Sequence, residues 1–116
     1  MITSILYSIK TQWGESIDDK SFDNDIIADI NLTLMKLTQL GVGPSAGFFI
    51  EDSTTNWADY VSDPFIHKPL ESYIYMEVKL VFDPPQTAAL LDALNRSISQ
   101  YEVRIRDWAE EKGSTV

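Results

Sequence analysis

Hydrophobic residues recur at helical spacing in the first third of the chain. Apolar positions in residues 3–12 or 3–13 share one face, and Gly14 is placed to end that helix. A second apolar stripe runs from Phe22 to Leu40, with Ser21 before it as a suitable N-cap and "GVGP" after it as a stop. The pattern therefore predicts one short helix followed by one longer helix.

A further helix is predicted from about Lys68 to Phe82, and its residues are apolar on almost every face. A helix of this kind is buried on most sides, either in the core of its own subunit or against neighbouring subunits.

Two consecutive prolines separate this helix from the last one. Asp83 precedes Pro84 and is therefore expected to be extended, as an N-cap must be. Pro84 and Pro85 would occupy the first two helical positions, and Gln86 the third, which completes a capping box. We therefore predict that the last helix begins at Pro84 and runs to about Lys112.

This last helix carries a heptad seam of apolar and aromatic residues spaced three and four apart. The seam consists of Leu91, Leu94, Ile98, Tyr101, Ile105 and Trp108. Because an intermolecular coiled coil usually needs more heptads, the seam is expected to pack within its own subunit.

Residues 45–66 are the irregular part of the chain. Within them "GFFIED" is either a short strand or an extended loop, and "TTNWADYVSD" is predicted to form one or two capped helical turns. This region also holds a cluster of aromatic residues: Phe48, Phe49, Trp57, Tyr60 and Phe65. Such side chains either fill a small core or anchor a partner, so these five are candidates for an oligomer or channel interface.

Together these elements predict one mostly α domain over residues 1–116. It is a compact arrangement of four to five helices, with a long amphipathic helix at the C-terminus and one long irregular loop that could contain a short β segment.

Composition narrows the classes of function. The chain has no cysteine, which excludes disulfides and thiol catalysis, and no apolar run as long as a membrane span. Its first residues lack the pattern of a signal peptide. The net charge is −9, and residues 15–63 hold ten acids and two bases. Lys and Arg do not cluster with aromatic residues, so specific binding to nucleic acid is not expected.

Each candidate catalytic or ligand-binding pattern in the sequence lacks a feature that its chemistry requires. His67 has Ser62 and Asp63 nearby in sequence, but no nucleophile-elbow pattern surrounds them. The acidic run "DDKSFDNDIIAD" does not match the spacing of a calcium loop, and "GVGPSAG" lacks the lysine of a phosphate-binding loop. We therefore predict no catalytic, cofactor-binding or metal-binding residues.

Several segments in order resemble a known family. These are "DDKSFDNDIIADIN", "LTQLGVGP", the tryptophan of "TTNWADYVSD", "ESYIYMEVKLVFDPP" and the final "ALNRSISQYEVRIRDWAEE". Together, over residues 3–111, they resemble the small head–tail connector (adaptor) proteins of tailed bacteriophages.

The resemblance implies a structural virion protein without enzymatic activity or cofactor. It implies a homo-oligomeric ring, twelve-fold on the portal, that extends the DNA channel without binding DNA specifically and offers a platform to the stopper or tail-completion protein. The protein would be assembled in the host cytoplasm and located at the head–tail interface of the virion. Arg104, Arg106 and Trp108 become candidates for docking to the portal, because related adaptors engage the portal through their C-terminal helix or tail.

One alternative function stays open at this point. The strongly acidic residues 15–63 would also suit an interaction module of a phage or prophage, such as a DNA mimic or a regulator.

Overall fold

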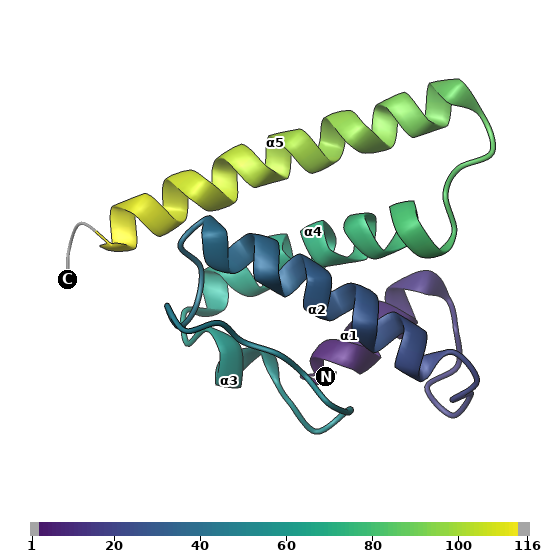
Figure 1. The fold of residues 1–116 in the computed structure, drawn as a ribbon, viewed down its shortest axis with the longest axis horizontal. Helices are drawn as coiled ribbons and strands as arrows, with labels where there is room; N and C mark the ends of the chain where they lie inside the picture. The colour runs from purple at the N-terminus through teal and green to yellow at the C-terminus, as the bar shows by residue number, and fades with distance from the viewer. Residues whose placement is uncertain (1–2, 114–116) are drawn as a thin grey trace.

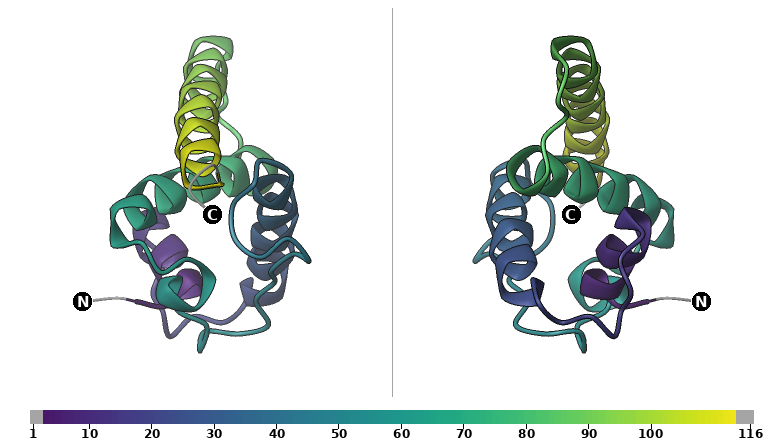
Figure 2. Two further views of the ribbon diagram at one scale, coloured as in Figure 1. Left: turned by 90° about the vertical axis from the view of Figure 1, so that its left-hand side faces the viewer. Right: turned by 90° about the vertical axis from the view of Figure 1, so that its right-hand side faces the viewer.

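The computed structural model describes residues 3–113, which form five helices, and one of the five lies at the centre of the packing. They are α1 (Ile5–Trp13), α2 (Asp23–Gln39), α3 (Trp57–Tyr60), α4 (Pro64–Phe82) and α5 (Ala88–Gly113). Helix α4 packs against α1, α2 and α5, and α5 lies along α4 on the side away from the other helices (Figure 1). The end-on views in Figure 2 show α1 and α3 on one side beneath α5 and α2 on the other. The predicted mostly α fold is confirmed.

The apolar character of α4 has the predicted structural consequence. Leu70, Tyr73, Ile74 and Val78 are fully buried, because three helices cover different faces of α4. From Leu94 to Trp108 the seam of α5 packs on the same core, and Ile105 is its most deeply buried member. The seam therefore stabilises the subunit itself, as predicted.

The first helix begins at Ile5, two residues after its predicted start, and ends at Trp13 as predicted. The Ser4 hydroxyl accepts a hydrogen bond from the Tyr7 N–H, and Gly14 ends the helix with a left-handed φ of 83°. Glycine reaches that conformation without the steric cost that a Cβ would bring.

The predicted N-cap of the second helix is wrong. Ser21 does not cap α2; its backbone N–H donates to the Asp19 carboxylate in a turn, and Phe22 stands at the N-cap position without a side-chain hydrogen bond. Short polar side chains such as Asp19 and Ser21 can form hydrogen bonds within a turn, and this turn is an alternative to capping the helix.

The irregular segment contains no strand within the part of the chain that the structure describes; it has one isolated antiparallel bridge, between Ser4 and Asn56. It is attached to α2 through Asn31, whose side chain accepts from the Ile50 N–H and donates to the Ile50 carbonyl. The predicted helical turn is present as α3, with a capping box made by Asn56 and Asp59.

Helix α4 begins four residues before its predicted start. Asp63 caps it by accepting from the Phe65 N–H, and Pro64 occupies the first turn, where proline costs no hydrogen bond. Pro69 then lies inside the helix, so the carbonyl of Phe65 has no N–H partner at the usual position.

Helix α5 begins four residues after its predicted start. Its cap is Thr87, whose hydroxyl accepts from the Leu90 N–H at 3.2 Å and whose carbonyl accepts from the Leu91 N–H. Asp83 instead ends α4, and the two prolines belong to the connection between the helices. A proline pair after an aspartate fits the end of one helix as well as the start of another, and here packing of α5 on α4 selects the later cap.

Candidate functional site

The aromatic cluster of the irregular region divides between core and surface. Trp57 and Tyr60 are buried, and the Trp57 indole donates to the Ser8 hydroxyl of α1 at 3.0 Å. Phe48 is half-buried, with its ring 4.7 Å from that of Tyr60. Phe49 and Phe65, in contrast, are 57% and 90% exposed. Three of the five aromatics therefore fill the core, and two are available to a partner.

Gly43 of "GVGP" packs against Tyr60. A Cβ on Gly43 would lie 2.6 Å from Cε1 of the Tyr60 ring, and Gly43 has a φ of 77°. Burial raises the pKa of the Tyr60 hydroxyl, so the phenol stays neutral. The glycine-rich segment thus covers an aromatic ring.

His67 does not form a catalytic arrangement with its neighbours. Its Nε2 lies within hydrogen-bonding distance of the Val61 carbonyl and therefore carries the ring proton, and its ring lies 6.3 Å from that of Trp57. The carboxylate of Asp63 accepts from other groups, described below.

The acidic link between α1 and α2 is organised by a buried lysine that the sequence analysis did not identify. Lys10 has no exposed side-chain surface, and its ammonium donates to the Asp19 carbonyl at 2.6 Å and to the Asp23 carboxylate at 2.7 Å. A third oxygen, the Ile17 carbonyl, lies 3.4 Å away. One carboxylate of the acidic run that was compared with a calcium loop, that of Asp23, is thus paired with a cation of the chain itself. Within residues 3–113 no group of three His, Asp or Glu side chains could hold a metal ion.

The C-terminal end of α5 is held to the start of α4 by Asp63. Its carboxylate accepts from the Phe65 N–H and the Trp108 indole, at 3.0 and 3.3 Å, and lies 3.5 Å from the Lys112 ammonium. The Phe65 hydrogen bond is the main reason that the pKa of Asp63 lies below its ordinary value, and Trp108 and Lys112 act in the same direction. Trp108, predicted to dock to a partner, is thus half-buried and bonded within the subunit.

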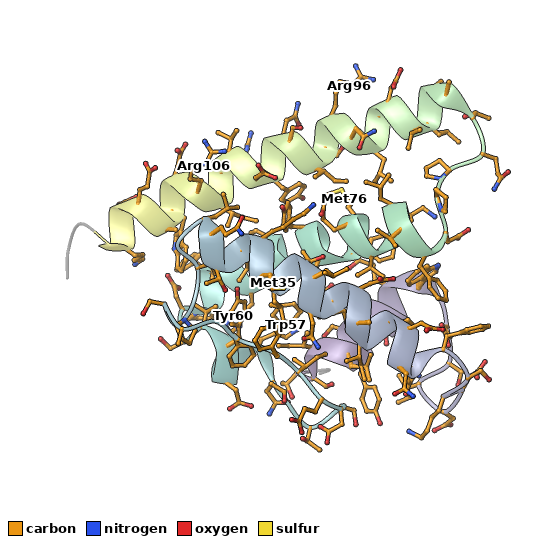
Figure 3. The ribbon with its side chains drawn as sticks, in the orientation of Figure 1. Met35, Trp57, Tyr60, Met76, Arg96 and Arg106 are labelled. Carbon is orange, nitrogen blue, oxygen red and sulfur yellow. The ribbon has the colours of Figure 1, made fainter. Side chains whose placement is uncertain are left out.

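The two predicted docking arginines have different surroundings. Arg106 is exposed and projects outward from α5, as does Arg96 (Figure 3), with the Glu102 carboxylate 3.8 Å from its guanidinium. Arg104 lines a hollow between α4 and α5. Among the described residues, no carboxylate lies within ion-pair distance of Arg104, although most cations of this acidic chain have one.

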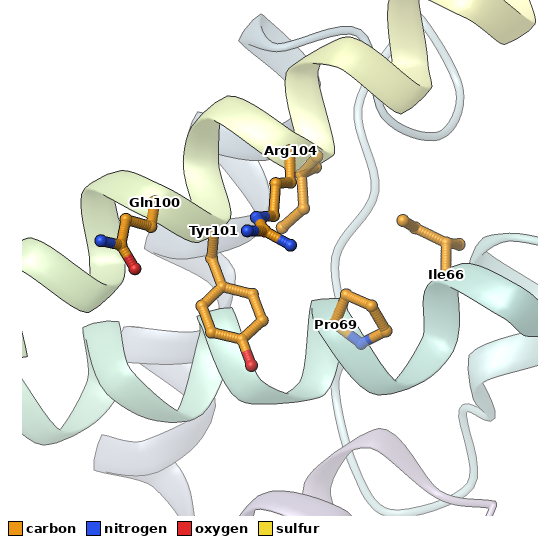
Figure 4. Close-up of a pocket in the computed structure, with 6 residues that line it drawn as sticks. Ile66, Pro69, Gln100, Tyr101 and Arg104 are labelled. Carbon is orange, nitrogen blue, oxygen red and sulfur yellow. The ribbon is translucent and has the colours of Figure 1, made fainter.

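The hollow beside Arg104 has a volume of about 420 Å³ and lies between side chains of α4 and α5 (Figure 4). It is lined by Ile66, Pro69, Gln100, Tyr101, Arg104 and Ile105. Phe65 lies one helical turn before Pro69, so its exposed ring stands at the same edge of α4. We call this surface the α4–α5 hollow.

A second hollow of about 300 Å³ lies between α2 and α4. Three of its lining residues are large apolar side chains that are about half or more exposed: Leu32, Met35 and Val81. Its polar edge contains Asp29 and the ion pair between Lys36 and Glu77. We call this surface the α2–α4 hollow.

These features define a helical domain with one hollow between α4 and α5 and another between α2 and α4. In residues 3–113 no helix has both the length and the apolar character needed to cross a membrane. The chain matches the family model described as "Phage connector protein" over residues 5–112, and it therefore belongs to the phage connector protein family, whose members are structural components of the virion. A comparison with curated proteins and another with solved structures each gave no significant match.

Proposed function

We propose that this protein is a head–tail connector (adaptor) that forms a ring beneath the portal. Twelve copies would match the symmetry of the portal, extend the DNA channel and present a platform to the stopper or tail-completion protein. The protein would be assembled in the host cytoplasm, act at the head–tail joint of the virion, and have no enzymatic role. The observation that carries this proposal is the family match over residues 5–112.

The physical properties of the chain support such a role. A net charge of −9 on a subunit of 116 residues leaves few cations to hold phosphates, so DNA could pass without being retained. A ring also needs two different complementary surfaces on each subunit. The two hollows provide candidate surfaces, because exposed apolar side chains line the α2–α4 hollow and the exposed Phe65 stands beside the α4–α5 hollow.

Among the aromatic candidates for the subunit or channel interface, Phe49 and Phe65 are the ones available in the folded subunit. Substituting Trp57 and Tyr60 would damage the core before it tested any interface. We expect Phe49→Ser combined with Phe65→Ser to reduce assembly into rings on the portal while the far-UV circular dichroism stays unchanged. Unaltered ring assembly by this double variant would count against the aromatic interface.

The end of α5 is the candidate element for docking to the portal, and Arg106 is its outward cation. Charge reversal in Arg106→Glu should weaken binding to purified portal, and Arg96→Glu is the matched control on the same helix. Equal portal binding by both variants would remove Arg106 from the docking contact.

The function itself is tested by deleting the gene from the phage or prophage that carries it and imaging the particles by electron microscopy. Separate tails beside heads that packaged DNA and lost it are the expected result. Intact, infectious, tailed virions would overturn the connector role and would favour the acidic interaction module instead.

A further inference from the structure

The two hollows lie on opposite sides of the subunit. The α2–α4 hollow is on the side of α2, and the first turns of α4, which border the α4–α5 hollow, are on the side of α1 and α3 (Figure 2). Surfaces on opposite sides of one molecule cannot meet within that molecule, but they can meet between two copies.

The α4–α5 hollow presents apolar side chains together with the cation of Arg104. Its lining includes Ile66, Tyr101 and Ile105, and it also includes Arg104, whose side chain is exposed. Within residues 3–113 no carboxylate pairs with that guanidinium, and the neighbouring Phe65 is 90% exposed. An anionic side chain next to a bulky apolar one would match this surface.

The α2–α4 hollow offers that chemistry. Leu32, Met35 and Val81 are 57%, 49% and 65% exposed, so the apolar groups project from the subunit. Asp29, on the preceding turn of α2, borders the same hollow, and none of the cations that the structure describes forms an ion pair with it. Partial burial, and secondarily the charge of Asp25, raise the pKa of the Asp29 carboxyl, which indicates a carboxylate that would gain from a cation.

We propose that the partner of the α4–α5 hollow is the α2–α4 hollow of a second copy of this chain, with Asp29 of one copy facing Arg104 of the next. Leu32 and Met35 then pack against Ile66 and the exposed face of Phe65. Because the two surfaces differ, the contact is head-to-tail and each subunit keeps one surface free for the next copy. This inference rests on the proposed function, and it identifies which surfaces join neighbouring subunits of the ring.

The head-to-tail geometry permits a test with two variants that each block one surface. Arg104→Glu disables the α4–α5 hollow and leaves the α2–α4 hollow intact, whereas Asp29→Arg does the reverse. Sedimentation velocity of the purified full chain should show a larger assembly for the wild type at rising concentration and a monomer for each variant alone. An equimolar mixture of the two variants should form dimers and larger assemblies again, because Asp29 of one variant meets Arg104 of the other at one contact and the two reversed charges attract each other at the next.

Matched controls separate a local contact from a general charge effect. Arg96→Glu and Asp92→Arg make the same charge changes on exposed positions of α5 outside both hollows, and they should associate like the wild type. Circular dichroism checks that each variant is folded, and Arg104→Ala replaces Arg104→Glu if the reversal perturbs the fold.

The contact is overturned if the mixture shows no dimer, whether or not the wild type associates. It is also overturned if the controls lose association as fully as the two blocking variants do. Wild-type rings with no dimer in the mixture would leave the connector role standing and reject only this contact. A dimer in the mixture together with intact virions after gene deletion would reject the connector role and leave the contact standing.

Discussion

The buried Lys10 provides the sharpest test of how this fold is held together. Its ammonium contacts the Asp19 carbonyl at 2.6 Å and the Asp23 carboxylate at 2.7 Å, and its side chain is 0% exposed. Lys10→Met keeps an unbranched apolar stem but removes the charge and its hydrogen bonds. The acidic link and the start of α2 then lose their common anchor.

The expected cost follows from what is left behind. Breaking a buried ion pair by removing one partner costs about 3–5 kcal/mol, because the other charge stays buried without compensation. The Asp23 carboxylate keeps 17% exposure and can recover some hydration, which favours the lower end of that range. We therefore expect the free energy of unfolding to fall by about 3 kcal/mol, a large part of the ~5–15 kcal/mol that stabilises most domains.

Urea unfolding followed by circular dichroism measures this loss. Lys68→Met is the control, because its ion pair with Glu71 is made by a lysine that is 82% exposed and should be worth less than about 1 kcal/mol. Adding Asp23→Asn to Lys10→Met should cost much less than Asp23→Asn costs in the wild type, since the two residues interact directly. A loss for Lys10→Met no larger than that for Lys68→Met would refute the assignment of Lys10 as the anchor of this segment.

Three further predictions concern the cap of α5, the glycine that packs against Tyr60, and Asp63, which holds the end of α5 to the start of α4. Because Thr87 caps α5, Thr87→Ala should lower the free energy of unfolding by about 1 kcal/mol, and Asp83→Ala should lower it by less than half of that. If thermal melts of the two variants show the opposite order, Asp83 is the cap, as predicted from the sequence. Gly43→Ala should cost more than Gly14→Ala in urea unfolding, because both glycines have positive φ but only a Cβ at Gly43 meets a ring; equal losses would contradict the ring contact. The pKa of Asp63 is lower in the folded protein than in the unfolded chain, so the wild type should be more stable than Asp63→Asn above about pH 4. This advantage should disappear as the pH falls through the folded-state pKa. A difference in melting temperature that is independent of pH would contradict this prediction.

Physical features that act over a few residues were predictable from the sequence alone. The heptad seam of α5, the apolar faces of α4 and the stop at Gly14 each depend on neighbours within about two helical turns, and each is present in the structure. The acidic charge of the chain and the absence of cysteine are likewise properties of the sequence, whatever its fold.

Features that depend on contacts between distant residues were decided only by the tertiary structure. "DPP" is compatible with a helix end or a helix start, and packing of α5 on α4 placed the cap at Thr87 instead of Asp83. Lys10 and Asp23 are thirteen residues apart, so a pattern of local spacing could not show that one lysine fills the acidic link. Trp57 and Phe65 are both aromatic residues of the same irregular region, and the sequence does not distinguish them. Trp57 is buried and donates a hydrogen bond to Ser8, forty-nine residues away, whereas Phe65 stays exposed. Local propensity determined where helices form in this protein, and long-range packing determined which of their side chains remain for a partner, because burial is a property of the assembled core.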